Sequence, residues 1–278
     1  MKFAYFPGCK IPFELKEYGD SFEAIMKKLE VRLIDLPFNC CGYPSKNKNL
    51  EISVLSSIRN LALAEQQGLD LITPCKCCYG QFKHAIYFWN NRTDLRIKIN
   101  KTLKNEGLSW KGETQIKHLL SFLYNDFGLL KLNHKITKPF SKEKIVVQYG
   151  CHALRPFSIT GFDDPFAPKI FEALVNIIGL KNLEWSKSTE CCGNPIYETN
   201  KKLSLKMLGS KLKTASETGA AYICNACTHC QIQYNFMVME QELKKFQITP
   251  VLFTQILGKA MGLTKNELGI INTDLFNF

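Results

Sequence analysis

Two sets of five cysteines, arranged in the same order in each half of the chain, constrain the fold more than any other feature. Each set begins with a cysteine after a glycine, continues with an adjacent Cys-Cys-Gly, and ends with a CxxC motif. Gaps of 30 and 33 residues separate the three parts of the first set, and gaps of 39 and 34 those of the second. This repeat predicts two related halves, each with one sulfur-ligated metal site. The candidate ligands are Cys9, Cys40, Cys41, Cys75 and Cys78, then Cys151, Cys191, Cys192, Cys227 and Cys230.

Metal ligation explains these cysteines better than inert packing or disulfides. Packing of buried thiols as small apolar groups does not require two matched patterns. Adjacent cysteines do not pair easily with each other, and the N-terminus shows neither the apolar core nor the cleavage site of a signal peptide. We therefore expect a cytoplasmic protein whose thiols stay reduced. A reversible CxxC dithiol remains possible for one pair, although it leaves the other cysteines unexplained.

The cysteines follow segments that alternate between strand-like and helix-like patterns. The predicted strands cover residues 2–6, 31–36, 69–73, 144–148 and 220–223. The predicted helices cover residues 22–29, 50–67, 94–105, 115–123, 168–178, 200–218 and 250–263. This order predicts an α/β fold of two homologous half-domains, each a small, mostly parallel sheet flanked by helices, with cysteines at strand ends. A lysine-rich segment with Pro139 places the boundary between residues 1–142, with a helical insertion, and 143–278, with a C-terminal helix.

Residue chemistry favours iron–sulfur clusters over zinc but leaves both open. A structural zinc takes four ligands in a tetrahedron, so five cysteines per half are one too many. Neighbouring side chains point apart on an extended backbone, which makes it difficult for Cys40 and Cys41 to reach one small ion. A cluster offers several iron positions and requires thiolate ligands. Zinc in one of the two sites remains the alternative.

Two cysteines are left outside the repeat. Cys224, Cys227 and Cys230 form two overlapping CxxC motifs, so the second half is ambiguous. We choose Cys227 and Cys230 because the gap from the preceding pair then matches the first half, and because Gln-Tyr follows Cys230 as Gln-Phe follows Cys78. Cys77 and Cys224 are then interpreted as spare thiols near the sites.

Further motifs accompany the cysteines and extend over almost the whole chain. They include Phe6-Pro7-Gly8-Cys9, Asn39-Cys40-Cys41-Gly42, Thr73-Pro74-Cys75, Tyr149-Gly150-Cys151-His152 and Cys191-Cys192-Gly193. The combined pattern resembles the cysteine-rich CCG-domain family, and most of all the B subunit of heterodisulfide reductase. Subunits of lactate-utilisation, glycerol-3-phosphate dehydrogenase and succinate dehydrogenase systems also carry CCG domains. The alternative is therefore an electron-transfer or assembly subunit of such a complex, with clusters or structural zinc.

The resemblance implies a catalytic subunit that makes or breaks disulfide or sulfane S–S bonds at two non-cubane 4Fe-4S clusters. Each five-cysteine set would hold one cluster, and the substrate disulfide would lie between them. Two clusters suit this chemistry because a disulfide takes two electrons. The family also implies two partner proteins in a heterodisulfide-reductase-like complex, a ferredoxin-like subunit with its own clusters and a flavin-containing subunit. The segment Phe38-Asn39-Cys40-Cys41-Gly42-Tyr43-Pro44 favours the sulfur-oxidising type, which implies a lipoate-binding sulfur carrier protein.

A few other polar residues are secondary candidates. His152 follows Cys151 directly and is a candidate proton donor to a leaving thiolate, or else a structural histidine. His229 could donate to a cluster sulfur, and Arg155 could hold an anionic substrate. We interpret Asp163-Asp164-Pro165 as a turn or helix cap.

The charge of the chain gives weaker information. The formal net charge of +11 fits a lysine-rich surface or attraction to acidic partners. We expect no nucleic-acid partner, because no basic stripe is interleaved with aromatic residues and no zinc-finger spacing occurs. The apolar stretches are too short to span a bilayer, so we expect no transmembrane segment.

Overall fold

The computed structural model describes residues 1–240, 243 and 245–270, and it has an α/β fold built on two four-stranded sheets. Every pair of neighbouring strands in both sheets is parallel. The first sheet has the order β2-β1-β3-β4, with β1 (Lys2–Tyr5), β2 (Arg32–Ile34), β3 (Leu71–Thr73) and β4 (Ile116–His118). The second has the order β6-β5-β7-β8, with β5 (Lys144–Gln148), β6 (Lys181–Asn182), β7 (Tyr222–Asn225) and β8 (Thr249–Leu252). The predicted pair of related half-domains is thereby confirmed.

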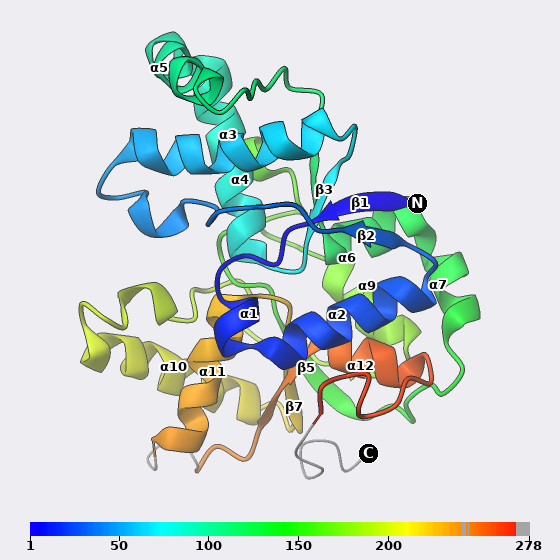
Figure 1. The fold of residues 1–278 in the computed structure, drawn as a ribbon. Helices are drawn as coiled ribbons and strands as arrows, with labels where there is room; N and C mark the ends of the chain where they lie inside the picture. The colour runs from blue at the N-terminus through cyan, green and yellow to red at the C-terminus, as the bar shows by residue number, and fades with distance from the viewer. Residues whose placement is uncertain (241–242, 244, 271–278) are drawn as a thin grey trace.

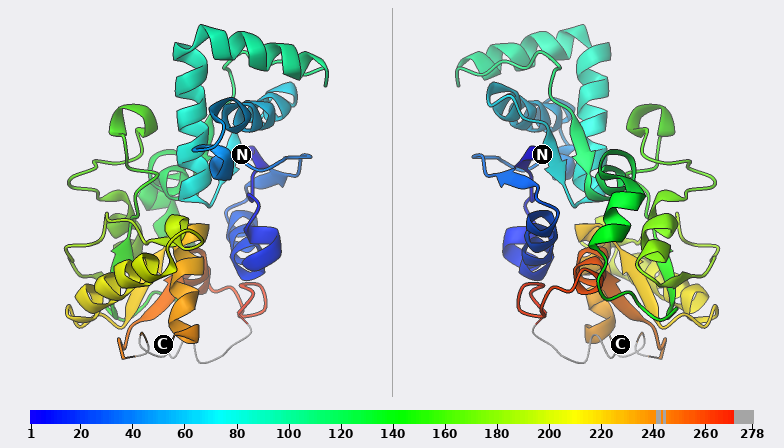
Figure 2. Two further views of the ribbon diagram at one scale, coloured as in Figure 1. Left: turned by 90° about the vertical axis from the view of Figure 1, so that its left-hand side faces the viewer. Right: turned by 90° about the vertical axis from the view of Figure 1, so that its right-hand side faces the viewer.

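Helices flank both sheets (Figure 1). The first half contains α1 (Ile11–Glu14), α2 (Lys16–Lys28), the 3-10 turn η1 (Tyr43–Ser45), α3 (Leu50–Gln66), α4 (Lys76–Asn91), α5 (Thr93–Lys104), α6 (Leu119–Ser121), the π-helical η2 (Phe122–Gly128) and α7 (Leu129–Lys135). The second half contains α8 (Phe157–Thr160), α9 (Ile170–Ile177), the 3-10 turn η3 (Asn194–Ile196), α10 (Lys201–Ser216), α11 (Thr228–Met239) and α12 (Phe253–Ala260). Both views in Figure 2 place α3 and α5 at the end of the molecule farthest from the C-terminal half.

Local sequence explains the long helices. Asn49 and Asn200 cap α3 and α10, because each side chain accepts a hydrogen bond from the backbone N–H three residues later, at 3.0 Å in both. Gly68 and Gly219 follow the two helices with positive φ, the conformation that glycine adopts at low cost. The two halves therefore use the same start and stop signals for the helix after the cysteine pair.

Two helix predictions are partly wrong in the same way. Residues 115–123 open with the strand β4 rather than a helix, and residues 250–263 open with β8 before α12 begins. In both places the segment pairs with the edge of a parallel sheet, next to β3 or β7, and this pairing outweighs the helical spacing. Helices α4 and α11, which begin immediately after the first cysteine of each CxxC motif, were not predicted from the sequence.

The two halves exchange their terminal helices. Helix α12 of the second half packs against α2 of the first, and α6 and η2 of the first half pack against α9 of the second. Figure 1 shows α12 beside α2, close to where the two halves meet. One hydrophobic core contains side chains from both sheets, so the halves form a continuous body.

The division at residues 142 and 143 stays a prediction, and residues 271–278 of the second predicted half lie outside the described residues. Within the described part of the chain, none of the helices combines the length and apolar character needed to cross a bilayer.

Candidate metal centres

The carboxyl ends of corresponding strands place the ten candidate cysteines. Cys9 and Cys151 lie in the turns after β1 and β5, and the adjacent pairs follow β2 and β6. Cys75 and Cys227 occupy the N-cap positions of α4 and α11, directly after β3 and β7. The ends of parallel strands meet at one edge of a sheet, so each set converges there, as predicted for an open α/β sheet.

A left-handed glycine shapes each Cys-Cys-Gly turn. Gly42 has φ +89° and Gly193 has φ +92°, a region that other residues adopt only with strain. A Cβ at Gly42 would lie 2.3 Å from the carbonyl oxygen of Ser53, and one at Gly193 would lie 2.9 Å from that of Ser204. The hydroxyls of the same serines donate to the two glycine carbonyls, at 2.9 Å in both halves. The glycine is therefore required because the turn packs against the backbone of α3 or α10.

The thiols of the first set form a chain of contacts. The sulfurs of Cys9 and Cys40 lie 3.9 Å apart. Cys40 interacts with Cys41, Cys41 with Cys78, and Cys78 with Cys75. Cys9 is exposed and Cys40 half-buried, whereas the other three are buried. The structure thus brings all five candidates together, with the open side at Cys9.

The second set repeats this chain of contacts. Cys151 interacts with Cys191, Cys191 with Cys192, Cys192 with Cys230, and Cys230 with Cys227. The first two are half-buried and the other three are buried. The same order of contacts in both sets matches the sequence repeat residue by residue.

Each set contains one thiol that is strongly acidic. Hydrogen bonds from Cys41 and Cys9 lower the pKa of Cys40 to about 2, and hydrogen bonds from Cys151 and Cys192 lower the pKa of Cys191 to about 2. The backbone N–H of Gly193 also points to the Cys191 sulfur, at 3.4 Å. A thiolate is the form of cysteine that ligates metals. The first cysteine of each adjacent pair is therefore an anion even in the protein alone.

The two sets meet at the junction of the halves. The Cys75 sulfur lies 3.0 Å from the Thr228 hydroxyl, and Cys75 also interacts with Cys227. On the other side, Gly80 of α4 allows a close approach, since a Cβ there would lie 2.3 Å from the carbonyl oxygen of His152. Each CxxC helix thus carries side chains from its own half to the cysteines of the other half.

The two spare cysteines differ in position. Cys77 is buried, interacts with Cys227, and lines a cavity of about 20 Å³ together with the second cysteine set. Cys224 lies within β7, paired in register with Val147 and Val251 of the neighbouring strands. The first is therefore a sixth thiol at the second site, whereas the second belongs to the sheet.

Two histidines and a tyrosine lie between the two sites. The His152 Nδ1 is 3.3 Å from the Cys151 sulfur, and burial lowers the pKa of His152. His229 Nδ1 is 2.5 Å from the Asn194 side-chain oxygen. The Tyr43 ring packs edge-on against both imidazoles, with ring centroids 4.6 Å from His152 and 5.5 Å from His229. Both histidines are candidates from the sequence, whereas Tyr43 was not predicted, although it follows the first Cys-Cys-Gly directly.

The remaining secondary candidates have structural surroundings. Arg155 is exposed and donates to the carbonyl of Thr189 at 2.8 Å. Asp163 accepts hydrogen bonds from the N–H groups of Lys169 and Ile170 at the start of α9, at 2.9 and 2.8 Å. Asp164 accepts from the two N–H groups that follow Pro165, at 2.8 and 3.0 Å. The interpretation of this segment as a turn and helix cap is confirmed.

The donor chemistry of both sites suits iron–sulfur clusters. Each set consists of five thiols, the ligand type that such clusters require. In residues 1–240, 243 and 245–270, no three His, Cys, Asp or Glu side chains converge on the position of a single metal ion. The cavity at the second site is close to the size of one water molecule, so the thiols would have to rotate apart to hold four irons.

The fold and the two sites define a class of protein: a duplicated α/β scaffold with a cysteine-rich centre at the strand ends of each half. Comparison with known proteins specifies the family. The cysteine-rich domain family CCG matches residues 3–83 and 145–235. The chain belongs to this family, and its homologues include the B subunits of heterodisulfide reductases.

Two relatives and one solved structure illustrate the similarity. The chain is 30% identical to the B subunit of the ferredoxin:CoB-CoM heterodisulfide reductase of Methanosarcina mazei, over 97% of this chain and 92% of that protein. It is 31% identical to the 8-methylmenaquinol:fumarate reductase membrane anchor subunit of Wolinella succinogenes, over 97% and 95%. A hypothetical protein from Helicobacter pylori shares the fold, with a TM-score of 0.75 and 20% identity over 96% of this chain and 50% of that one. The family and these relatives mark the chain as an iron–sulfur protein of electron-transfer, oxidoreductase type.

Proposed function

We propose that the chain is the catalytic B subunit of a heterodisulfide-reductase-like complex, and that it makes or breaks S–S bonds of a disulfide or persulfide. The observation that carries this proposal is the meeting of two equivalent five-thiol sets at one junction, where Cys75 interacts with Cys227. Cleavage of a disulfide consumes two electrons and two protons and yields two thiols. Two one-electron centres on either side of the substrate provide this stoichiometry.

The ten matched cysteines are the proposed ligands and catalytic groups. One non-cubane 4Fe-4S cluster would be held by each set, and such clusters supply single-electron transfer and an open iron position for sulfur. The first set is Cys9, Cys40, Cys41, Cys75 and Cys78, and the second is Cys151, Cys191, Cys192, Cys227 and Cys230. The acidic thiols Cys40 and Cys191 favour metal binding in both sets, because they are anionic without it.

Protons come from the chain's own side chains in this proposal. His152 lies beside Cys151, at the inner edge of the second site, and His229 lies across the Tyr43 ring. Burial lowers the pKa of both imidazoles, so each gives up a proton readily to a developing thiolate. Tyr43 keeps the two rings apart and fixes their orientation.

Electrons come from partner proteins in this proposal. We expect a ferredoxin-like subunit, supplied with electrons by a flavin-containing subunit, in the cytoplasm. A lipoate-binding sulfur carrier is the expected substrate protein if the complex works on sulfane sulfur. The similarity to a heterodisulfide reductase that is named for ferredoxin supports the first partner.

The alternative is an electron-transfer or assembly subunit of a dehydrogenase-type complex. The similarity to a protein of a fumarate reductase favours it. The two candidates differ in one respect that can be measured. Only the first predicts turnover of a disulfide or persulfide by this chain with an artificial electron donor.

Substitution of single cysteines tests the proposed function. We expect Cys191→Ser to lose about half of the iron and all S–S bond chemistry, because the other set stays intact but each turnover needs two electrons. Cys224→Ser is the matched control, since this thiol lies within β7 rather than in either set. It should keep both iron and activity. Full turnover by Cys191→Ser would refute the two-centre reaction.

A further inference from the structure

Two buried lysines lie at the second cysteine set. Lys76 and Lys211 are only 2% and 1% exposed, which is rare for a lysine without a carboxylate partner at contact distance. The nearest charged groups to Lys76 are the thiols of Cys230 and Cys227, and those to Lys211 are Cys230 and Cys192. Both lysines therefore act on the same five-thiol site.

Backbone carbonyls and aromatic rings hold the two ammonium groups. Lys76 donates to the carbonyl of Gln148 at 3.1 Å and lies 4.4 Å from the centroid of the Phe171 ring. Lys211 donates to the carbonyl of Glu190 at 3.1 Å and lies 4.9 Å from the centroid of Trp185. Burial lowers the pKa of each lysine to about 8, which still leaves both protonated at neutral pH.

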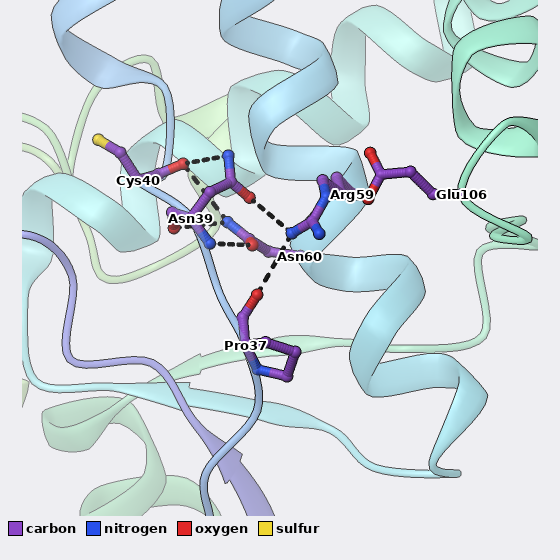
Figure 3. A network of polar contacts seen from close by, with 6 residues as sticks. All are labelled: Pro37, Asn39, Cys40, Arg59, Asn60 and Glu106. Atoms are coloured by element: carbon purple, nitrogen blue, oxygen red, sulfur yellow. Dashed lines mark hydrogen bonds and ion pairs between the residues drawn. The ribbon is translucent and has the colours of Figure 1, made fainter.

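The equivalent position to Lys211 in the first half is a neutral asparagine. Asn60 and Lys211 each lie eleven residues after the asparagine that caps their helix. Asn60 donates to the carbonyls of Asn39 and Cys40, at 3.1 and 3.4 Å (Figure 3). Asn39 precedes the first cysteine pair as Glu190 precedes the second. Binding of this loop therefore does not require a charge, and the charge of Lys211 is an addition at the second site.

The equivalent of Lys76 is also neutral. Lys76 and Thr228 each follow the first cysteine of their CxxC, and each crosses to the other half. Lys76 thus reaches the second set, whereas Thr228 reaches the first, where its hydroxyl lies 3.0 Å from the Cys75 sulfur. The first set has a nearby cation in Lys10, but this side chain is 36% exposed and paired with Glu14. The two sites match in thiols and differ in buried charge.

We infer that Lys76 and Lys211 make the second set the electron-accepting side of the protein, so that a cluster held there takes an electron before one held by the first set. This inference rests on the proposed function. A one-electron reduction by the donor protein adds one negative charge, which two buried cations stabilise. The exposure of Cys9 opposes the difference, since water also stabilises charge at the first site. Two full charges in a poorly screened interior outweigh this hydration, and the nearby carboxylates of Glu190 and Glu172 are engaged by Lys187 and Tyr149.

The test is a redox titration of the full chain, purified without oxygen and followed by electron paramagnetic resonance. Cys41→Ser and Cys192→Ser assign the signals, because each should lose those of its own set. We expect the signal that is missing in Cys192→Ser to have the higher midpoint potential. Lys211→Gln should shift that potential to more negative values and leave the other unchanged. Lys213→Gln, an exposed lysine on the same helix, is the matched control and should shift neither.

A second pair of variants separates charge from folding. Lys76→Gln should produce the same selective shift, and Lys211→Arg, which keeps the charge, should retain the parent potential. The inference is overturned if the first-set signal has the higher potential, or if the potentials of both lysine-to-glutamine variants equal that of the parent. Absence of clusters in the parent chain would instead overturn the proposed function, so the two failures are distinguishable.

Discussion

A close backbone contact between the two halves makes a sharp prediction about stability. Gly80 lies in α4 with ordinary helical backbone angles, and a Cβ there would lie 2.3 Å from the carbonyl oxygen and 3.2 Å from the Cβ of His152. The carbonyl belongs to the backbone of the turn that carries Cys151, so it cannot rotate away. Gly80→Ala must therefore push α4 and this turn apart.

The size of the effect follows from two opposing terms. Overpacking of a well-packed contact costs about 1–3 kcal/mol, and the clash at Gly80 is with backbone, which favours the upper part of this range. Replacing a helical glycine by alanine gains about 1 kcal/mol. The net loss should be about 1–2 kcal/mol, or about 2–8 °C in Tm for a chain of this size.

A second helical glycine provides the matched control. At Gly209 in α10, an added Cβ would meet only the end of the Leu243 side chain, at 3.4 Å. Gly209→Ala should therefore raise Tm by about 1–4 °C, because only the helix term remains. Thermal unfolding of the parent and both variants, followed by circular dichroism under argon, measures the two shifts. A Gly80→Ala chain as stable as Gly209→Ala would refute the close approach of the halves at His152.

Two further predictions concern pH and helix capping. Burial, together with the charge of Lys76, lowers the pKa of His118 to about 3, well below its value of about 6.5 in an unfolded chain. Stability is therefore complete above pH 6.5 and falls as the unfolded state takes up the proton, by about 2 kcal/mol at pH 5; His118→Gln should flatten this part of the profile in urea titrations, and an unchanged slope would contradict it. Asn49→Ala and Asn200→Ala should each cost about 1 kcal/mol in the same assay, because each removes one capping hydrogen bond, and a loss in only one of them would argue against equivalent caps.

The repeated cysteines made much of the fold predictable. Strands end where the cysteines begin, so the spacing of Cys9, Cys40 and Cys75 located three of the four strands of the first sheet. The asparagine caps and following glycines similarly defined α3 and α10. These features are local, and local signals are those that a single sequence carries.

The edge strands could not be predicted in this way. β4 and β8 are three and four residues long, and neighbouring helical residues obscure their pattern. They are strands because β3 and β7 offer free parallel edges, which is information from the tertiary structure. The predicted helices therefore extended over them.

The residues that cross between the halves were the least predictable part of the sites. Lys76, Cys77 and Thr228 lie beside ligand cysteines of their own half in sequence, yet their side chains reach the cysteines of the other half. This follows from the packing of α4 and α11 at the junction, which no motif records. The difference in buried charge between the two sites became apparent only when equivalent positions could be compared in space.

The central claim is that both five-cysteine sets hold iron–sulfur clusters, and the content of iron, acid-labile sulfide and zinc per chain tests it most directly. The chain should be purified without oxygen and measured before and after cluster reconstitution. We expect about eight irons with matching sulfide, as two four-iron clusters require. One or two zinc ions without iron, persisting after reconstitution, would contradict the claim and favour a structural role for the cysteines.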